Sequence, residues 1–100
     1  MIRHLVMWRV SGDTPGERRL AGLRVKTAFE GLRGRIPGMS HLEVNQAADA
    51  PDEACDVVLI AEFDSDDALA AYATHAEHLR VRSELAGVRT ARHYIDYRLE

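Results

Sequence analysis

DVVLIAEF, residues 56–63, carries the strongest strand signal in the sequence. Because successive side chains of a strand alternate, this stretch points apolar side chains to both faces of a sheet. One face receives Val57, Leu59, Ala61 and Phe63, and the other receives Val58 and Ile60. An antiparallel sheet with one face in water normally has one apolar and one polar face. The stretch therefore predicts a sheet with two apolar faces, both of which need to be covered.

Three further strands are predicted around this stretch. Residues 1–10 combine β-branched and large apolar residues without a breaker, and residues 39–46 alternate between apolar and polar. Residues 88–99 form a long final strand. In the first strand, His4, Val6 and Trp8 fall on one face, and Leu5 and Met7 fall on the other. We therefore expect the histidine and the tryptophan on the same face of the sheet.

The first helix is predicted from its start signal. Thr14 caps the helix, Pro15 takes the first helical position, and Glu17 completes a capping box. The helix is expected to end at Gly34, before the turn at residues 37–38. Its apolar stripe, which faces the sheet, consists of Ala21, Val25, Ala28, Phe29 and Leu32.

A second helical segment follows the central strand. Residues 64–67, DSDD, place capping side chains and carboxylates where a helix N-terminus favours them. The helical pattern continues to Gly87, with a candidate break near His75. The order of elements is therefore β-α-β-β-α-β, which is the ferredoxin-like α+β fold with a four-stranded antiparallel sheet and both helices on one face.

Composition limits the classes of protein that this chain can be. Its 100 residues, with 46% apolar and 29% charged, predict a single globular domain spanning residues 1–100. A net charge of −3 argues against nucleic-acid or membrane binding. For the basic residues gathered in residues 16–36, a solvated helix face is favoured over an anion-binding patch. One cysteine, Cys55, and an N-terminus unlike a signal peptide or a membrane span predict a cytoplasmic protein.

The second sheet face needs a cover that two helices cannot provide. This face carries Leu5, Met7, Val58 and Ile60. Leaving several hundred Å² of apolar sheet in water would cost many kcal/mol at about 25 cal/mol per Å². The simplest cover is the same face of a second copy, so we expect a homodimer with a symmetric interface.

Three segments together resemble the stress-responsive A/B barrel (Dabb) domain family. They are IRHLVMW at residues 2–8, Ile36-Pro37-Gly38, and YATHAEH at residues 72–78. The resemblance implies two ferredoxin-like subunits whose sheets meet as a dimeric α+β barrel, with a cavity between sheet and helices in each. The family includes plant stress-induced proteins and a polyketide cyclase that performs an aldol condensation without metal or cofactor.

The resemblance also implies site residues. Tyr72 and His78 correspond to the catalytic tyrosine and histidine of the cyclase, and His4 corresponds to a histidine lining the same pocket. Further ligand-pocket residues are expected to be Trp8, Val6, Phe29 and His75. Two departures are evident. Ala76 stands where the family usually has a proline that kinks the helix, and Val57 stands where the cyclase has a further histidine.

The chemistry of these side chains fits proton transfer. A neutral histidine can take a proton from a carbon next to a carbonyl, and a tyrosine hydroxyl can stabilise the enolate oxygen that develops. However, Tyr72 and His78 are six positions apart, about 240° around an ideal helix. They converge on one pocket only if the helix bends near His75. Otherwise Tyr72 is a core residue and His78 bonds to a backbone carbonyl.

Three functions stay open at this point. The first is binding of a small, mostly apolar ligand by a homodimer. The second is a cofactor-free cyclase, lyase or isomerase that acts on a polyketide-like substrate. The third is a structural stress protein without small-molecule chemistry. His75 and His78 have the spacing of two metal ligands, but no further ligand is evident, so we expect no metal and no cofactor.

Overall fold

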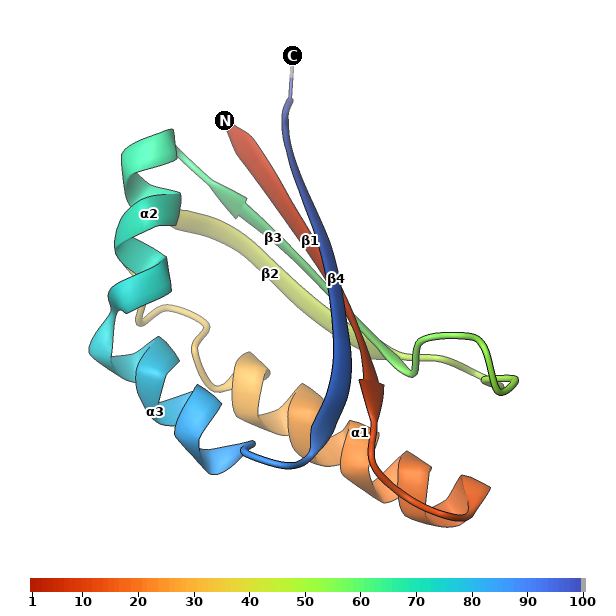
Figure 1. Ribbon diagram of the computed structural model, residues 1–100. Coiled ribbons are helices and arrows are strands. Elements are labelled where there is room, and N and C mark those ends of the chain that lie inside the picture. Colours follow the sequence, from red (N-terminus) through yellow and green to blue (C-terminus); the bar gives the residue numbers. More distant parts are fainter. Residues whose placement is uncertain (100) are drawn as a thin grey trace.

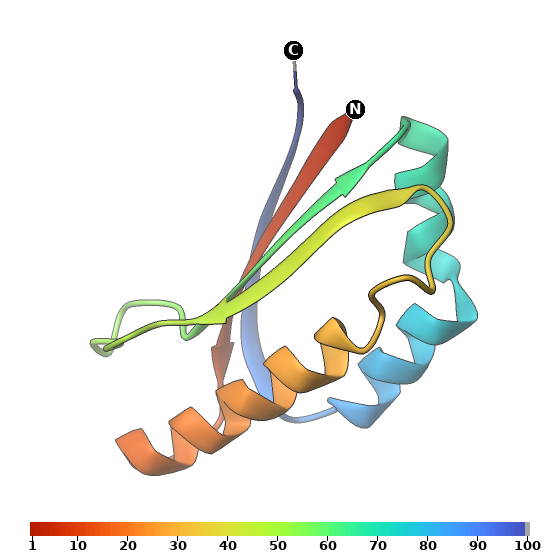
Figure 2. The same ribbon diagram turned by 180° about the vertical axis from the view of Figure 1, so that it is seen from behind.

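The computed structural model describes residues 1–99. The elements are β1 (Ile2–Val10), α1 (Pro15–Glu30), β2 (Met39–Gln46), β3 (Val57–Phe63), α2 (Asp66–Thr74), α3 (Ala76–Glu84) and β4 (Arg89–Arg98). The strands form one antiparallel sheet in the order β2-β3-β1-β4. All three helices lie on the same side of this curved sheet, and its other side carries no helix (Figures 1 and 2). The ferredoxin-like α+β prediction is confirmed.

The second helical segment is two helices, not one. α2 ends at Thr74, and α3 begins at Ala76, because His75 has extended backbone angles (φ −63°, ψ 137°). The His75 side chain then accepts a hydrogen bond from the Glu77 backbone N–H at 3.1 Å and so caps α3. The break therefore forms without a proline. The candidate break near His75 is confirmed, although Ala76 stands where the family usually has a proline.

The first helix also ends earlier than predicted. Its last residue is Glu30, and Gly31 follows as the C-terminal cap. Beyond it the chain tightens into turns, with the Leu32 N–H bonded to the Phe29 carbonyl at 3.0 Å. Gly34 therefore lies in the turn that follows the helix. Its start agrees with the sequence, since the Thr14 hydroxyl accepts the Glu17 N–H at 3.1 Å.

The hydrophobic core lies between the helices and one face of the sheet. The β3 side chains alternate as expected, and the four that face the helices are fully buried: Val57, Leu59, Ala61 and Phe63. The helix side of β1 likewise buries His4, Val6 and Trp8. The core therefore has the composition that the alternation predicts, with His4 as its only buried polar residue within residues 1–99.

The opposite side of the sheet forms an outer apolar face. It consists of Leu5, Met7, Val58, Ile60, Ile95 and Tyr97. Leu5 pairs with Ile60 on one side and with Ile95 on the other, so the apolar strip crosses the three strands β3, β1 and β4. Met7, Ile95 and Tyr97 are 38%, 57% and 37% exposed. The face is therefore larger than the sequence indicated, because β4 extends it.

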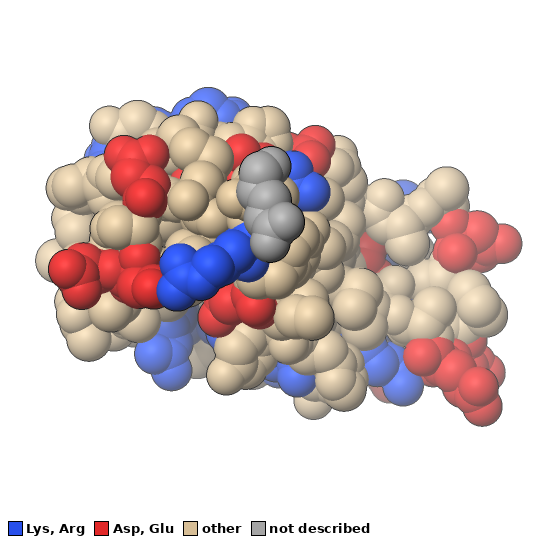
Figure 3. Space-filling model, turned by 90° about the horizontal axis from the view of Figure 1, so that it is seen from above, with Lys and Arg blue, Asp and Glu red and all other residues tan. Residues whose placement is uncertain are grey.

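Charged side chains are distributed unevenly over the surface. Figure 3 shows acidic side chains at both ends of the molecule and basic side chains mostly between them. Lys26 on α1 and Arg33 in the turn after it donate hydrogen bonds to the carbonyls of Val44 and Leu42 at 2.7 and 2.6 Å. These two basic residues thus satisfy the edge of β2 instead of forming an anion site. Within residues 1–99, none of the helices has the length and the apolar composition of a membrane span.

Candidate functional site

A cavity of about 280 Å³ lies between the sheet and the helices. Its walls come from β1, β3, β4 and the three helices. They are His4, Val6, Trp8, Phe29, Leu59, Tyr72, Ala73, His78, Arg82, Arg89 and Arg92. Six of the seven residues expected at the site are therefore brought together in one cavity.

The alternation of β1 and the break at His75 position these side chains. β1 presents His4, Val6 and Trp8 to the helices because they share one strand face. The change of direction between α2 and α3 brings His78 back over Tyr72, whose ring it stacks against with 4.2 Å between ring centres. The convergence that required a bend is therefore present.

Aromatic packing forms the inner wall of the cavity. The Trp8 and Phe29 rings are stacked with centres 4.8 Å apart, and both residues are almost fully buried. The Trp8 indole N–H has no hydrogen-bond partner within residues 1–99. Trp8 thus packs in the hydrophobic core and also lines the cavity.

His78 is held in a form that can accept a proton. Its Nδ1 lies 3.3 Å from the Ala73 carbonyl oxygen. A carbonyl can only accept, so Nδ1 carries the proton and Nε2 keeps its lone pair. Burial lowers the pKa of His78, and the hydrogen bond to the Ala73 carbonyl opposes this shift only in part. The imidazole is therefore neutral near pH 7.

Tyr72 is suited to donate a hydrogen bond. Burial raises the pKa of its hydroxyl well above the ordinary value, although the positive charges of Arg89 and Arg92 act in the opposite direction. Tyr72 is 4% exposed and also packs against Phe63. Its hydroxyl therefore stays protonated at any physiological pH and can serve as a donor to a ligand oxygen.

His4 is oriented by a carboxylate. Its Nδ1 lies 2.5 Å from Oδ1 of Asp96, which is its partner across the β1–β4 ladder. The carboxylate accepts, so Nδ1 of His4 carries a proton. The His4 ring centre lies 6.2 Å from that of Tyr72. Both histidines thus carry a proton on Nδ1 and lie beside Tyr72.

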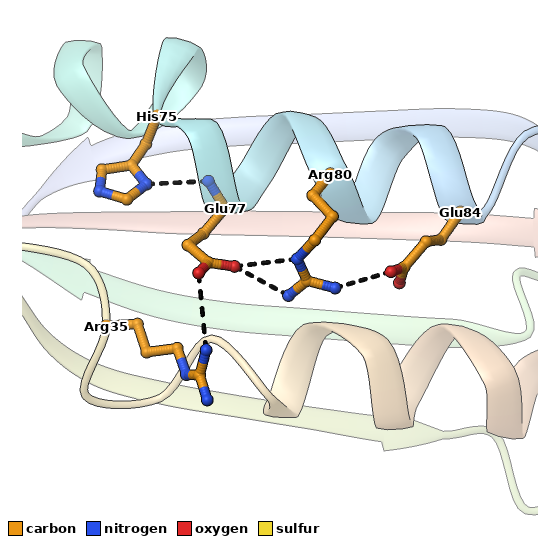
Figure 4. Close-up of polar contacts among 5 residues, drawn as sticks. All are labelled: Arg35, His75, Glu77, Arg80 and Glu84. Atoms are coloured by element: carbon orange, nitrogen blue, oxygen red, sulfur yellow. Dashed lines mark hydrogen bonds and ion pairs between the residues drawn. The ribbon is translucent and has the colours of Figure 1, made fainter.

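His75, expected in the pocket, does not line the cavity. Its ring caps α3, next to a charged cluster in which Glu77 pairs with Arg35 and Arg80, and Arg80 also pairs with Glu84 (Figure 4). The reason is the extended backbone at His75, which makes this residue the N-cap of α3. Within residues 1–99, no three His, Cys, Asp or Glu side chains are grouped as a metal site requires.

Four polar residues of the site were missed from the sequence. Asp96 contacts His4, and Arg82, Arg89 and Arg92 line the cavity. For Arg92 and Asp96 the signal was available, because they alternate with His93, Ile95 and Tyr97 and so lie on the helix side of β4. For Arg82 it was not, since its place depends on the break at His75.

A second hollow has no comparable chemistry. It lies between α1 and α3, measures about 550 Å³, and is lined by Leu20, Leu23 and Leu85 among others. It contains no histidine or tyrosine. The smaller cavity is therefore the candidate site.

Comparison with known proteins supports one family. The sequence profile of the Stress responsive A/B Barrel Domain (Dabb) matches residues 2–99. The chain belongs to the Dabb family. No curated protein sequence matches this Dabb chain.

Solved structures with the same fold include three informative examples. A dimeric protein of unknown function with a ferredoxin-like fold from Bacteroides fragilis is 30% identical, with a TM-score of 0.83 over 98% of this Dabb chain and 95% of that one. A Dabb family protein from Mesorhizobium loti is 22% identical, with a TM-score of 0.77 over 99% and 96%. Hydroxynitrile lyase from Passiflora edulis is 12% identical, with a TM-score of 0.78 over 99% and 93%, which shows a shared fold alone.

Proposed function

We propose that this Dabb protein is a homodimer that binds a small, mostly apolar ligand in the cavity between its sheet and its helices. The observation that carries the proposal is the convergence of His4, Tyr72 and His78 on one cavity of about 280 Å³. A purely structural protein would have filled this space with apolar side chains. Two imidazoles and a phenol on its walls favour a ligand instead.

The size and the walls of the cavity indicate the class of ligand. Ligand pockets of proteins usually measure about 300–1,000 Å³, so this cavity suits a molecule at the small end of that range. The stacked Trp8 and Phe29 rings, with Val6 and Leu59, offer an apolar surface on which a flat ring or a short alkyl chain can pack. The polar side chains that also line the cavity would orient the ligand.

The dimer is supported by the outer apolar face. Met7, Ile95 and Tyr97 are each more than a third exposed on a sheet side that no helix covers. The relative from Bacteroides fragilis is described as dimeric. Burial of this face against the same face of a second copy removes the apolar surface from water and forms the two-sheet barrel. A cytoplasmic location is part of the proposal and is supported by the free thiol of Cys55.

Catalysis is a second candidate, and the state of His78 and Tyr72 favours it. Nε2 of neutral His78 would take a proton from a carbon next to a ligand carbonyl, and the C–H electron pair would move onto the carbonyl oxygen. The Tyr72 hydroxyl would donate a hydrogen bond to this oxygen. Attack of the resulting carbon on a second carbonyl of the same molecule would close a ring, and the new alkoxide would take the proton back. The reaction class is a cofactor-free cyclase, lyase or isomerase.

A thermal-shift screen of aromatic and polyketide-like compounds tests the binding proposal. We expect at least one compound to raise the melting temperature of the wild type and to raise that of His78→Ala less. His41→Ala is the matched control, because His41 is exposed on the edge strand β2 and belongs neither to this cavity nor to the outer apolar face. Failure of every compound to shift the wild type, or hits that His78→Ala leaves unchanged, would contradict the proposed site.

A further inference from the structure

Three arginines line the cavity. Arg82 comes from α3, and Arg89 and Arg92 come from β4. Arg89 is half-buried, and its guanidinium carbon lies 5.6 Å from the Trp8 ring centre and 5.7 Å from that of Phe29. The Arg92 guanidinium lies over the Tyr94 ring at 4.4 Å. Aromatic contacts thus hold the two β4 guanidinium groups in place.

These arginines differ from most others in the chain. Arg3, Arg35, Arg80 and Arg98 each pair with a carboxylate within 3.5 Å. Within residues 1–99, Arg82, Arg89 and Arg92 form no ion pair and donate no side-chain hydrogen bond. Their positive charges are therefore concentrated at the cavity in a protein whose net charge is −3.

This arrangement is unfavourable without an anion. Burial lowers the pKa of Arg89, and the nearby positive charges of Arg82 and Arg92 lower it further. Asp96, the acidic residue at the cavity edge, is already bonded to His4. Arg82 and Arg92 are more exposed than the half-buried Arg89, and within residues 1–99 none of the three has a carboxylate partner.

We infer that the ligand is a small organic anion, whose oxyanion end is bound by Arg89, Arg92 and Arg82 and whose apolar body packs on Trp8 and Phe29. The guanidinium fork matches a carboxylate or another planar oxyanion with paired hydrogen bonds. The inference rests on the proposed function, because it assigns a charge and an orientation to the ligand of the same cavity. It places the oxyanion beside Tyr72, because Arg89 and Arg92 lie close enough for their positive charges to influence the Tyr72 hydroxyl.

The test compares two probes of equal shape, 3-phenylpropionate and its neutral amide, 3-phenylpropanamide. Binding of each is followed by amide NMR titration of the full chain. We expect the carboxylate to bind at least about tenfold more tightly than the amide, since it gains charge-assisted hydrogen bonds. Raising the KCl concentration should weaken binding of the carboxylate and leave binding of the amide unchanged.

Substitutions assign the effect to the arginines. Arg89→Gln and Arg92→Gln should each weaken carboxylate binding by about tenfold, with amide binding unchanged. Arg98→Gln is the matched control, because Arg98 is on the same strand but pairs with Asp66. Arg89→Lys keeps the charge, so it should retain most of the preference and guards against misfolding of Arg89→Gln.

The outcomes separate this inference from the proposed function. Equal binding of the two probes, or unchanged carboxylate binding by both glutamine variants, would overturn the anionic ligand and leave a cavity that binds neutral molecules. No perturbation of any cavity resonance by either probe would overturn the ligand-binding proposal and this inference together.

Discussion

Removing only the hydroxyl of Tyr72 should separate folding from function. In the folded chain, burial raises the pKa of Tyr72. Within the described residues 1–99, no hydrogen bond of the Tyr72 hydroxyl contributes to this shift. Tyr72→Phe therefore deletes no intramolecular hydrogen bond. We expect a change in unfolding free energy of less than about 0.5 kcal/mol, which is about 2–4 °C in melting temperature for a domain of this size.

The ring of Tyr72, in contrast, is structural. It is 4% exposed and lies 4.2 Å from the His78 ring and 5.2 Å from the Phe63 ring, measured between centres. Tyr72→Ala should lower the unfolding free energy by about 3–5 kcal/mol, as truncation of a buried aromatic side chain usually does. Urea unfolding of the two variants and of the wild type measures both quantities.

Binding gives the functional half of the test. A ligand that accepts the hydroxyl hydrogen bond should bind Tyr72→Phe about five- to tenfold more weakly, which corresponds to about 1 kcal/mol. Tyr94→Phe is the control, since Tyr94 is 59% exposed and does not line the cavity. A loss of more than about 1.5 kcal/mol of stability in Tyr72→Phe would refute this reasoning, because the hydroxyl would then have a structural partner.

Three other predictions test the packing and the electrostatics. Phe29→Ala should lower the unfolding free energy by about 3–5 kcal/mol in urea, because Phe29 is 1% exposed. Since burial lowers the pKa of His78, the unfolded chain binds its proton first as the pH falls through about 6.5. Stability measured by melting should therefore fall on acidification, and less so in His78→Gln. Gly38→Ala should destabilise more than Gly34→Ala: both have positive φ, but only at Gly38 would a Cβ meet Ala68, at 2.6 Å.

Local rules were sufficient for most of the fold. The alternation of residues 56–63 identifies the two apolar sheet faces, and the Thr14 cap identifies the start of α1. The end of α1 was predicted too late because Gly31 already caps it, and Leu32 is buried from the following turn. A buried apolar residue at helical spacing does not show whether it belongs to the helix or to the turn that follows.

The site depends on features that a sequence reports less directly. His4 and Tyr72 were predicted from the family resemblance, and Trp8 because it shares a strand face with His4. The break at His75 is made by the histidine's own side chain, and no proline announces it. Arg82 lines the cavity only because that break turns α3. The positive charge of Arg82 at the cavity thus depends on long-range geometry that the sequence does not show.

The position of the proton on the His78 imidazole decides whether Nε2 is available to a ligand in the cavity. Long-range proton–nitrogen NMR of the histidine rings at pH 7 reports which nitrogen carries the proton and whether a ligand reaches the other. We expect the proton on Nδ1, held by the Ala73 carbonyl, and a shift of the Nε2 resonance when 3-phenylpropionate is added. A proton on Nε2, or an Nε2 resonance that saturating probe leaves unchanged, would contradict this expectation.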